Sequence, residues 1–252
     1  MFMNWRASMR LLWVLLAVTP LWAQVNIEHY RGKEGITGGA RLSLNSNIGN
    51  VDVVKSDGAG NVTVNTQTGT YLTVFKGGIG FLGGKRFANS GVLHMRYTHT
   101  SNARWQPEIF AQGDYAKSRR LDQRTLLGAG LRRTWSSEGE VTFSLGSSLM
   151  WEREALSLSA GDPHPSRASV GRSSTYVNMH IRRSLGFAVT AYYQFDLADP
   201  SDVRLLGTGE LTTPLWGPLK QTTTIDFRTD SAPPLGVKKT DAKLSTSFGV
   251  AF

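Results

Sequence analysis

The feature that most constrains this chain is a two-residue alternation of apolar and polar side chains, which recurs from residue 35 to the C-terminus. The stretch VTFSLGSSLMW at 141–151 is a clear example. Successive side chains of a β-strand point to opposite faces, so this period predicts strands with one apolar and one polar face. The segments run about 10 to 17 residues, whereas ordinary strands average about 5 to 6. Such lengths favour strands that cross a membrane, which need about 9 to 11 residues.

Two further features indicate that the apolar face points outward into lipid. The polar face carries many charged and large hydrophilic side chains, which the core of a soluble sandwich rarely accepts. Aromatic side chains gather near the segment ends on the apolar face, as in the interfacial girdle of a membrane barrel. They are Trp105, Tyr115, Trp135, Trp151, Phe195 and Trp216. Because a closed barrel pairs every backbone group in hydrocarbon, the predicted fold is all-β, a single antiparallel transmembrane β-barrel.

Twelve strands are expected, an even number as in bacterial single-chain barrels. Their predicted ranges are 35–46, 50–65, 70–82, 89–100, 104–117, 121–135, 139–157, 172–185, 187–198, 202–213, 217–230 and 239–252. Tight turns at 136–140 and 183–186 fall on one side, and long loops at 161–171 and 231–239 fall on the other. This division predicts periplasmic turns and extracellular loops. The second strand is the weakest of the twelve, because its DGAGN stretch at 57–61 would equally suit a turn.

The N-terminus has the form of a secretory signal peptide at residues 1–23. MFMNWRASMR carries two arginines and no acid, LLWVLLAVTPLW is mostly apolar, and Ala23 precedes Gln24. An apolar run of this length is too short to span about 30 Å of hydrocarbon as a helix. We therefore expect a cleaved signal peptide, a short periplasmic segment at 24–34 and a barrel at 35–252. The predicted location is the outer membrane of a Gram-negative-type envelope, reached by export.

Composition narrows the classes of function and partner. The chain has no cysteine, so it can form neither a disulfide framework nor a thiolate nucleophile nor a Cys-based zinc site. It has 28 Lys and Arg against 19 Asp and Glu. The basic residues are spread among the alternating segments without a concentrated face, which argues against nucleic acid. The expected partners are outer-membrane lipid and lipopolysaccharide, the barrel assembly machinery and periplasmic chaperones.

The last ten residues, KLSTSFGVAF, alternate to the final aromatic. Phe248, Val250 and Phe252 lie on the apolar side of this alternation. Such a terminal strand is similar to the signal by which the outer-membrane assembly machinery recognises barrel substrates. The alternative is a strand that simply ends the domain.

Several stretches resemble a known family. HMRYTH at 94–99, FAQGDYAKSRRLDQRTLLGAGLR at 110–132, the Asn-rich NSNIGN at 45–50 and DSAPPLGVKKTD at 230–241 are similar to domain-of-unknown-function family 481. Its members are often labelled salt-induced outer membrane proteins, and the resemblance covers roughly residues 33–252. It implies an outer-membrane barrel, with a link to salt or osmotic stress that rests on the label. The family supplies no catalytic or cofactor-binding residues.

No residue pattern points to catalysis, a cofactor or a metal. His99 could lie near Ser101, as a lipid-hydrolysing barrel would need, but an orienting partner and an oxyanion hole are not evident. The carboxylates at 57–61 and 199–202 have too few oxygen ligands for a dedicated Ca²⁺ site, and turn chemistry explains them. The glycine-rich stretch 76–85 lacks the ending of a phosphate-binding loop. We predict a non-enzymatic protein, with barrel lipid hydrolysis as the least favoured alternative.

The lumen is the best candidate for function. The alternation places a set of charged and histidine side chains on the inward face: Arg41, His94, Arg96, Glu108, Asp114, Arg132, His180, Arg182, Asp196, Arg204, Glu210, Asp226 and Arg228. Barrels of about 8 strands are filled by side chains, whereas those of 16 to 18 leave a channel, so twelve strands are intermediate. The two interpretations are a narrow pore whose charges set selectivity and a closed, salt-bridged lumen in a structural or interaction protein.

Overall fold

The computed structural model describes residues 35–47, 53–101, 104–137, 140–182 and 184–251. The expected signal peptide, the segment 24–34 and Phe252 lie outside these ranges, so the proposed domain division stays a prediction. Twelve strands are present: β1 (Gly35–Asn47), β2 (Val53–Asn65), β3 (Gly69–Leu82), β4 (Lys85–His99), β5 (Gln106–Ala116), β6 (Leu121–Ser137), β7 (Val141–Leu156), β8 (Arg167–Arg182), β9 (Gly186–Asp196), β10 (Val203–Trp216), β11 (Leu219–Asp230) and β12 (Thr240–Ala251). A short 3-10 turn, η2 (Lys117–Arg119), follows β5.

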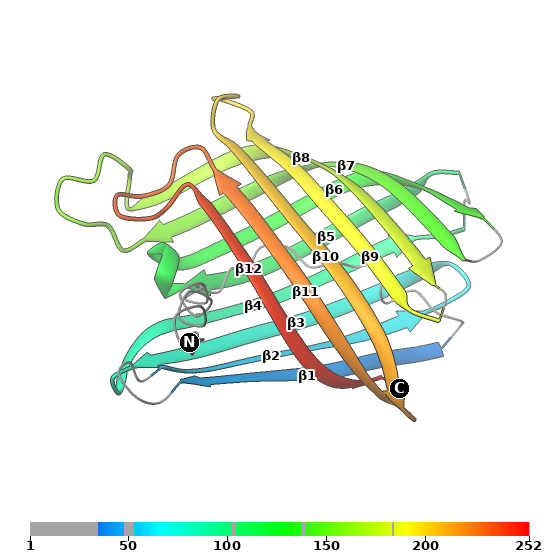
Figure 1. Cartoon of the computed structure of the whole chain (residues 1–252). Coiled ribbons are helices and arrows are strands. Elements are labelled where there is room, and N and C mark those ends of the chain that lie inside the picture. The colour runs from blue at the N-terminus through cyan, green and yellow to red at the C-terminus, as the bar shows by residue number, and fades with distance from the viewer. Residues whose placement is uncertain (1–34, 48–52, 102–103, 138–139, 183, 252) are drawn as a thin grey trace, which may run out of the picture.

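The strands form one closed antiparallel barrel in which each pairs with its neighbours in sequence and β12 pairs with β1 (Figure 1). The strand ends that lead from β2 to β3, β4 to β5, β6 to β7, β8 to β9 and β10 to β11 therefore lie at one end, which we call the turn end. Those that lead from β1 to β2, β3 to β4, β5 to β6, β7 to β8, β9 to β10 and β11 to β12 lie at the other, which we call the loop end. The two longest connections, 157–166 and 231–239, project together from the loop end in Figure 1. The predicted barrel and its strand number are confirmed.

The second strand, the weakest of the twelve predictions, is confirmed: 57–61 lies in the middle of β2, where Asp57 pairs with both Ser43 and Gly78. Two expected strand starts were wrong. The fourth strand begins at Lys85, not at 89, and the eighth begins at Arg167, not at 172, so the loop before the eighth is shorter than expected. At the start of β8 the alternation is weak in large apolar residues, and pairing to the neighbouring strand sets the structure.

Glycines in the wall are covered by aromatic rings from the adjacent strand. A Cβ added to Gly60 would lie 2.3 Å from the Phe75 ring, and one added to Gly146 would lie 2.3 Å from Tyr176. The rings of Tyr97, Tyr115 and Phe110 lie in the same way over glycines at 69, 91 and 128. Such cover lets a glycine sit within a strand without leaving its backbone exposed. This explains how the glycine-containing DGAGN stretch forms strand.

The seam between β1 and β12 also depends on a glycine. Arg41 pairs with Gly249 and Leu42 pairs with Phe248. A Cβ at Gly249 would come within 2.6 Å of the Ala40 carbonyl oxygen, so a larger residue there would push the two strands apart. Phe248 and Val250, two residues of the expected assembly signal, lie on the outer face of this closing strand.

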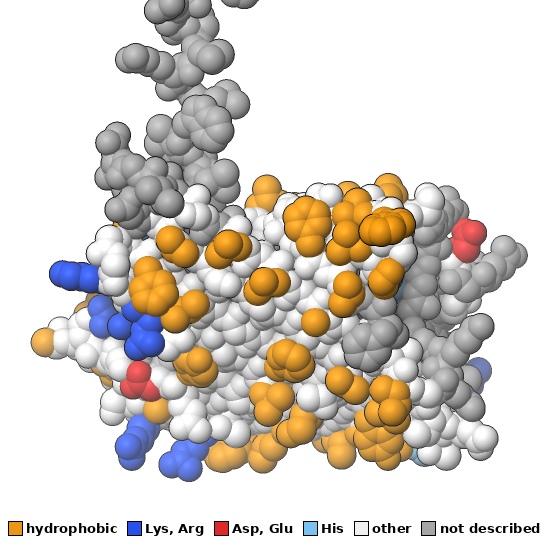
Figure 2. Space-filling model, turned by 90° about the horizontal axis from the view of Figure 1, so that it is seen from below, with side chains coloured by type: hydrophobic (Ala, Val, Ile, Leu, Met, Phe, Trp, Pro, Cys, Tyr) orange, Lys and Arg blue, Asp and Glu red, His pale blue; other side chains and the backbone are white. Residues whose placement is uncertain are grey.

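The outer wall is apolar and the interior is not. Large apolar side chains are exposed on every strand, including Ile36, Tyr71, Leu127, Leu149 and Ile225. Figure 2 shows them spread over the barrel wall, while Lys and Arg gather at the loop end. None of the helical structure in the described ranges is long and apolar enough to cross a membrane.

The wall has the height of a bilayer. On β6 and β7, aromatic residues mark two levels, one at the pair Leu127 and Trp151 and one at the pair Trp135 and Phe143. The eight residue steps from Leu127 to Trp135 along β6 span about 26 Å at about 3.3 Å per residue, or about 20 Å along the barrel axis for strands tilted by about 40°. This is close to the roughly 25 Å apolar band of membrane barrels. The strands therefore form a transmembrane barrel.

An apolar wall predicts a large penalty for a lipid-facing charge. Ile225 lies midway along β11 and is exposed on the outer face. We expect Ile225→Arg to lower the free energy of unfolding in vesicles by about 2–4 kcal/mol, as for cations at the bilayer midplane. The control is Leu235→Arg, in the connection 231–239, which should change little. Equal losses in the two variants would contradict a lipid-facing β11.

Candidate functional site in the charged interior

The barrel interior is lined by buried polar and ionic side chains. Of the residues expected to face the lumen, ten are buried: His94, Arg96, Glu108, Asp114, Arg132, His180, Asp196, Arg204, Glu210 and Arg228. Arg41 and Asp226 lie on the same face and are partly exposed. The side chain of Arg182 lies outside the described part of the structure, although its backbone is in β8. Because a buried charge needs a partner, the interior is best understood through its ion pairs.

Glu108 on β5 is the centre of the first group. Its carboxylate accepts hydrogen bonds from Arg96 on β4 at 3.2 Å and from Thr98 at 2.9 Å. Tyr176 on β8 donates its hydroxyl to the same carboxylate at 2.7 Å. The nearest nitrogen of Arg132 on β6 lies 3.8 Å away. Since β5 and β8 are separated by two strands, the Tyr176 bond bridges part of the lumen at mid-height.

Aromatic rings enclose the Arg96 guanidinium. Its carbon lies 5.1 Å from the centre of the Phe110 ring and 5.7 Å from that of Tyr176. Tyr176 in turn packs against Tyr192 with ring centres 5.2 Å apart. A desolvated cation gains from aromatic faces. The strands β4 to β9 thus carry bulky side chains inward, and we call this half of the interior the bulky wall.

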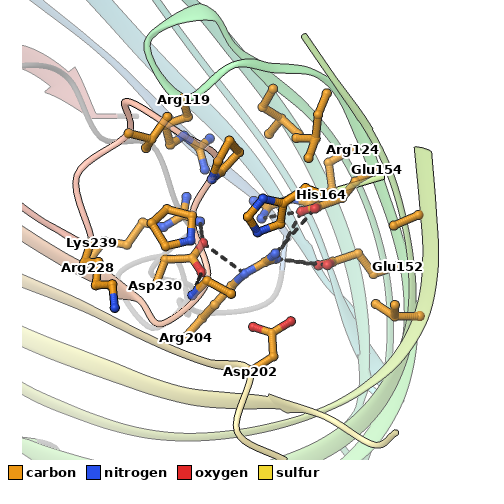
Figure 3. A pocket seen from close by; sticks show the side chains of 18 of the residues that line it. Arg119, Arg124, Glu152, Glu154, His164, Asp202, Arg204, Arg228, Asp230 and Lys239 are labelled. Carbon is orange, nitrogen blue, oxygen red and sulfur yellow. Dashed lines mark hydrogen bonds and ion pairs between the residues drawn. The ribbon is translucent and has the colours of Figure 1, made fainter. Parts of the chain in front are cut away.

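A second group of ion pairs lies at the loop end. Arg204 reaches Glu152 at 2.9 Å, Glu154 at 3.1 Å and Asp230 at 3.2 Å, and Arg172 reaches Glu152 at 3.0 Å. Figure 3 shows Arg204 pointing between these carboxylates. They line a pocket of about 220 Å³ with a mixed lining of basic, acidic and proline side chains.

The opposite half of the interior carries smaller side chains. Inward residues of β11, β12, β1 and β2 include Thr224, Ser245, Ser247, Ser43 and Ala59, which line a cavity of about 40 Å³. We call this the small-residue wall. Charged side chains of both signs line the same cavity: Arg41, Asp57, Lys76, Asp226 and Lys243. Lys243 lies 3.2 Å from Asp57, Lys55 lies 3.4 Å from Asp57, and Arg41 lies 3.0 Å from Glu210. Asp226 accepts a hydrogen bond from Thr208 at 3.0 Å.

Hydrogen bonds tie the loops together above the pocket. The Leu235 amide donates to Asp162 at 2.7 Å, which joins the connections 231–239 and 157–166. The Asp162 carboxylate also lies 2.6 Å from the His164 ring. Desolvation raises the pKa of Asp162, but the hydrogen bonds from His164 and from the Leu235 amide outweigh it and hold this pKa below its usual value. Ser231, in the connection 231–239, accepts a hydrogen bond from the Val203 amide and donates one to the Ser201 carbonyl oxygen.

Several interior charges were missed by the sequence analysis. Arg172, Glu154 and Asp230 belong to the group at the loop end, and Lys55 and Asp57 to the small-residue wall. Arg172 would have been found by extending the alternation of 178 and 180 back along β8. The signal for Lys55 and Asp57 was weak because the strand itself was in doubt. Glu154 and Asp230 form ion pairs with the predicted Arg204, so they extend the same site.

The geometry offers no catalytic constellation in the part of the chain that is described. His99 contacts the Tyr97 hydroxyl at 3.0 Å, not a serine. Asp162 and His164 form an Asp–His pair that was not foreseen, but no hydroxyl nucleophile is hydrogen-bonded to that ring within the described ranges. In the same ranges, no three His, Cys, Asp or Glu side chains are grouped as metal ligands.

An apolar wall around an ionic interior defines a transmembrane β-barrel protein. Residues 40–252 match the family described as Protein of unknown function, DUF481, and the chain belongs to that family. This confirms the resemblance drawn from the sequence. No match was found among curated proteins.

Solved barrels are similar in fold. The NanC porin aligns with a TM-score of 0.49 at 9% identity, over 86% of this chain and 97% of that one. The translocator domain of the autotransporter NalP from Neisseria meningitidis aligns at 0.49 and 11% identity, over 88% of this chain and 89% of that one. The KdgM porin aligns at 0.38 and 7%, over 86% and 96%. All three TM-scores are below one half, so the function must be argued from this chain's own residues.

Loss of Glu108 should destabilise the barrel. Glu108→Ala leaves the buried Arg96 without its carboxylate, and removal of one partner from a buried pair costs about 3–5 kcal/mol. Asp122 is an exposed carboxylate bonded to Ser157, and Asp122→Ala should cost less than about 1.5 kcal/mol. Equilibrium unfolding in urea with folded, vesicle-inserted protein measures both values. Similar small losses would mean that the interior pair is hydrated and contributes little.

The hydrogen bond from the Leu235 amide to Asp162, which joins the two loops, should depend on pH. Because the pKa of Asp162 is lowered in the folded protein, its stabilising effect is present above the usual aspartate range and is lost as the pH falls through the lowered value. Asp162→Ala should remove the protection of the Leu235 amide in hydrogen exchange at neutral pH. Asp199→Ala, which removes a carboxylate bonded only within 199–201, should leave that amide protected. If the Leu235 amide stays protected in Asp162→Ala, this hydrogen bond does not hold the two loops together.

Proposed function

We propose that this protein is a non-enzymatic outer-membrane barrel that passes small ions or solutes along a narrow, charged path. The observation that carries the proposal is the asymmetry of its interior. The bulky wall is filled by Arg96, Tyr176 and their neighbours, whereas the small-residue wall presents serine, threonine and alanine between charged side chains. We place the solute path against β11, β12, β1 and β2, where these residues line a cavity of about 40 Å³.

The charges along this side fit a path for small polar solutes. Lys243, Asp57 and Asp226 belong to the lining of the small-residue wall and carry both signs. Opposing charges close together replace part of the hydration of an ion without binding one sign strongly, and such linings tune selectivity. The pocket at the loop end would be the outer entrance of this path.

A second candidate is a structural or interaction barrel with a closed lumen. It is favoured by the bond from Tyr176 to Glu108 between non-adjacent strands and by the loops tied through Asp162 and Ser231. In that case the connections 157–166 and 231–239 would meet a partner, and the ion pairs would replace a hydrophobic core.

The location and partners are part of the proposal. The even strand number and the short connections at one end support an outer-membrane barrel with its turn end in the periplasm. Outer-membrane lipid and lipopolysaccharide would surround the wall, and periplasmic chaperones and the barrel assembly machinery would act on the closing strand with Phe248 and Val250. A role in salt or osmotic stress rests on the family label alone.

A blocking substitution tests the path. Ser247 lies on the small-residue wall, and its neighbour Thr246 is exposed on the outer face of the same strand. We expect Ser247→Phe to lower single-channel conductance in a planar bilayer severalfold, because the ring fills the narrow space. Thr246→Phe adds the same ring to the lipid side and should conduct like the wild type.

The same recordings separate the two candidates. Arg96→Ala removes a bulky side chain from the opposite wall and should raise the conductance. Equal conductance in Ser247→Phe and wild type would place the path elsewhere. Silence from correctly folded, heat-modifiable wild type and from Arg96→Ala would reject the channel and favour the closed barrel.

A further inference from the structure

The outer wall carries a hollow with a charged residue beside it. The hollow lies over β6 and β7 near the turn end and has a volume of about 590 Å³. Its rim includes Trp105, Trp135, Leu145 and Leu149, and the small side chain of Ser147 lines it as well. Arg133 on β6 lines the same hollow. A smooth lipid-facing wall would have neither the depression nor the cation.

Arg133 is held by two tryptophans. Its guanidinium carbon lies 5.0 Å from the centre of the Trp135 ring and 5.7 Å from that of Trp105. The side chain is half-buried, and within the described residues its contacts are these two rings, with no ion pair or hydrogen bond. The rings fix the position of the cation but leave its N–H groups available, because aromatic faces accept no strong hydrogen bond.

The height of Arg133 in the wall indicates what lies beside it. Arg133 pairs with Leu145, and this pair lies two residues along the strands from the aromatic level of Trp135 and Phe143. Two residues of a tilted strand correspond to about 5 Å along the barrel axis. The guanidinium therefore lies at the boundary between the hydrocarbon and the headgroups of the leaflet at the turn end. A cation at this depth requires an anionic partner or must reach toward the interface.

We infer that this hollow binds one phospholipid, whose phosphate is bound by Arg133. The guanidinium presents paired N–H donors that match phosphate oxygens, Trp105 and Trp135 flank the headgroup, and an acyl chain lies along Leu145, Ser147 and Leu149. The unpartnered cation at headgroup height favours a lipid over a second copy of the chain. The turn end favours a phospholipid over lipopolysaccharide, since short turns are periplasmic.

Native mass spectrometry of the full barrel tests this site. Delipidated protein is incubated with dioleoyl phosphatidylglycerol in detergent, and the fraction carrying one lipid is measured. Arg133→Gln should lower the apparent affinity about tenfold, the effect of losing one charge-assisted hydrogen bond. Ser147→Phe keeps the charge but fills the hollow, and it should lower the affinity as well. The control Arg153→Gln removes an exposed arginine of β7 near the loop end and should bind like the wild type.

These comparisons are made only with variants that are folded, as judged by heat-modifiable migration on a gel. Equal lipid retention in Arg133→Gln and Arg153→Gln would overturn the assignment of the phosphate. Unchanged retention in Ser147→Phe would show that the hollow does not hold the acyl chain. A wild-type dimer that Arg133→Gln converts to monomers would show that a second copy, rather than a lipid, covers the hollow. None of these results depends on whether the lumen conducts.

Discussion

The rest of the structure depends on one constraint, which is that backbone N–H and C=O groups cannot remain unpaired in hydrocarbon. The pairing of β1 with β12 satisfies it by closing the ring. Once the ring is closed, every strand has one face in lipid and one in the interior, so the apolar residues must point outward and the charges inward. The ion pairs of Glu108 and Arg204 follow from this geometry, because no other surface within the membrane could hold them.

The sequence was sufficient for the strand number and for most of the faces. On β7 the alternation is complete, and large outward residues such as Leu149 and Trp151 identify the lipid side without help from the rest of the chain. It was least certain at β2 and wrong at the start of β8, where large apolar residues are sparse. At β2 the glycines are covered by Phe75 from β3, and the start of β8 is held by pairing between Ala155 and Arg167. Both are contacts between strands, which a local pattern cannot reveal.

The partners of the interior residues were less accessible to prediction than their faces. The alternation places Glu108 and Tyr176 inside the barrel. It does not reveal that their side chains lie 2.7 Å apart, because 68 positions separate them in the sequence. That contact depends on barrel radius and strand stagger. The missed Arg172 shows the same limit, because its pairs with Glu152 and Asp202 join β8 to β7 and to the connection before β10. Buried ion pairs are weak evidence for stability, so we interpret them as fixing which side chains meet in the interior.

The arrangement of the bulky wall bears on how the lumen could open. Gly128 and Gly146 allow the rings of Phe110 and Tyr176 to lie against the neighbouring strands, where a Cβ would come within 2.2 and 2.3 Å of them. Contacts between non-adjacent strands then rest on polar side chains, such as the Tyr176 hydroxyl at Glu108 and Arg204 at Glu152. Breaking one hydrogen bond to a charged group costs about 1.5–3 kcal/mol, whereas separating two strands breaks a whole ladder of bonds. Movement of one side chain is therefore a far less costly way to change the width of this barrel than any change in its wall.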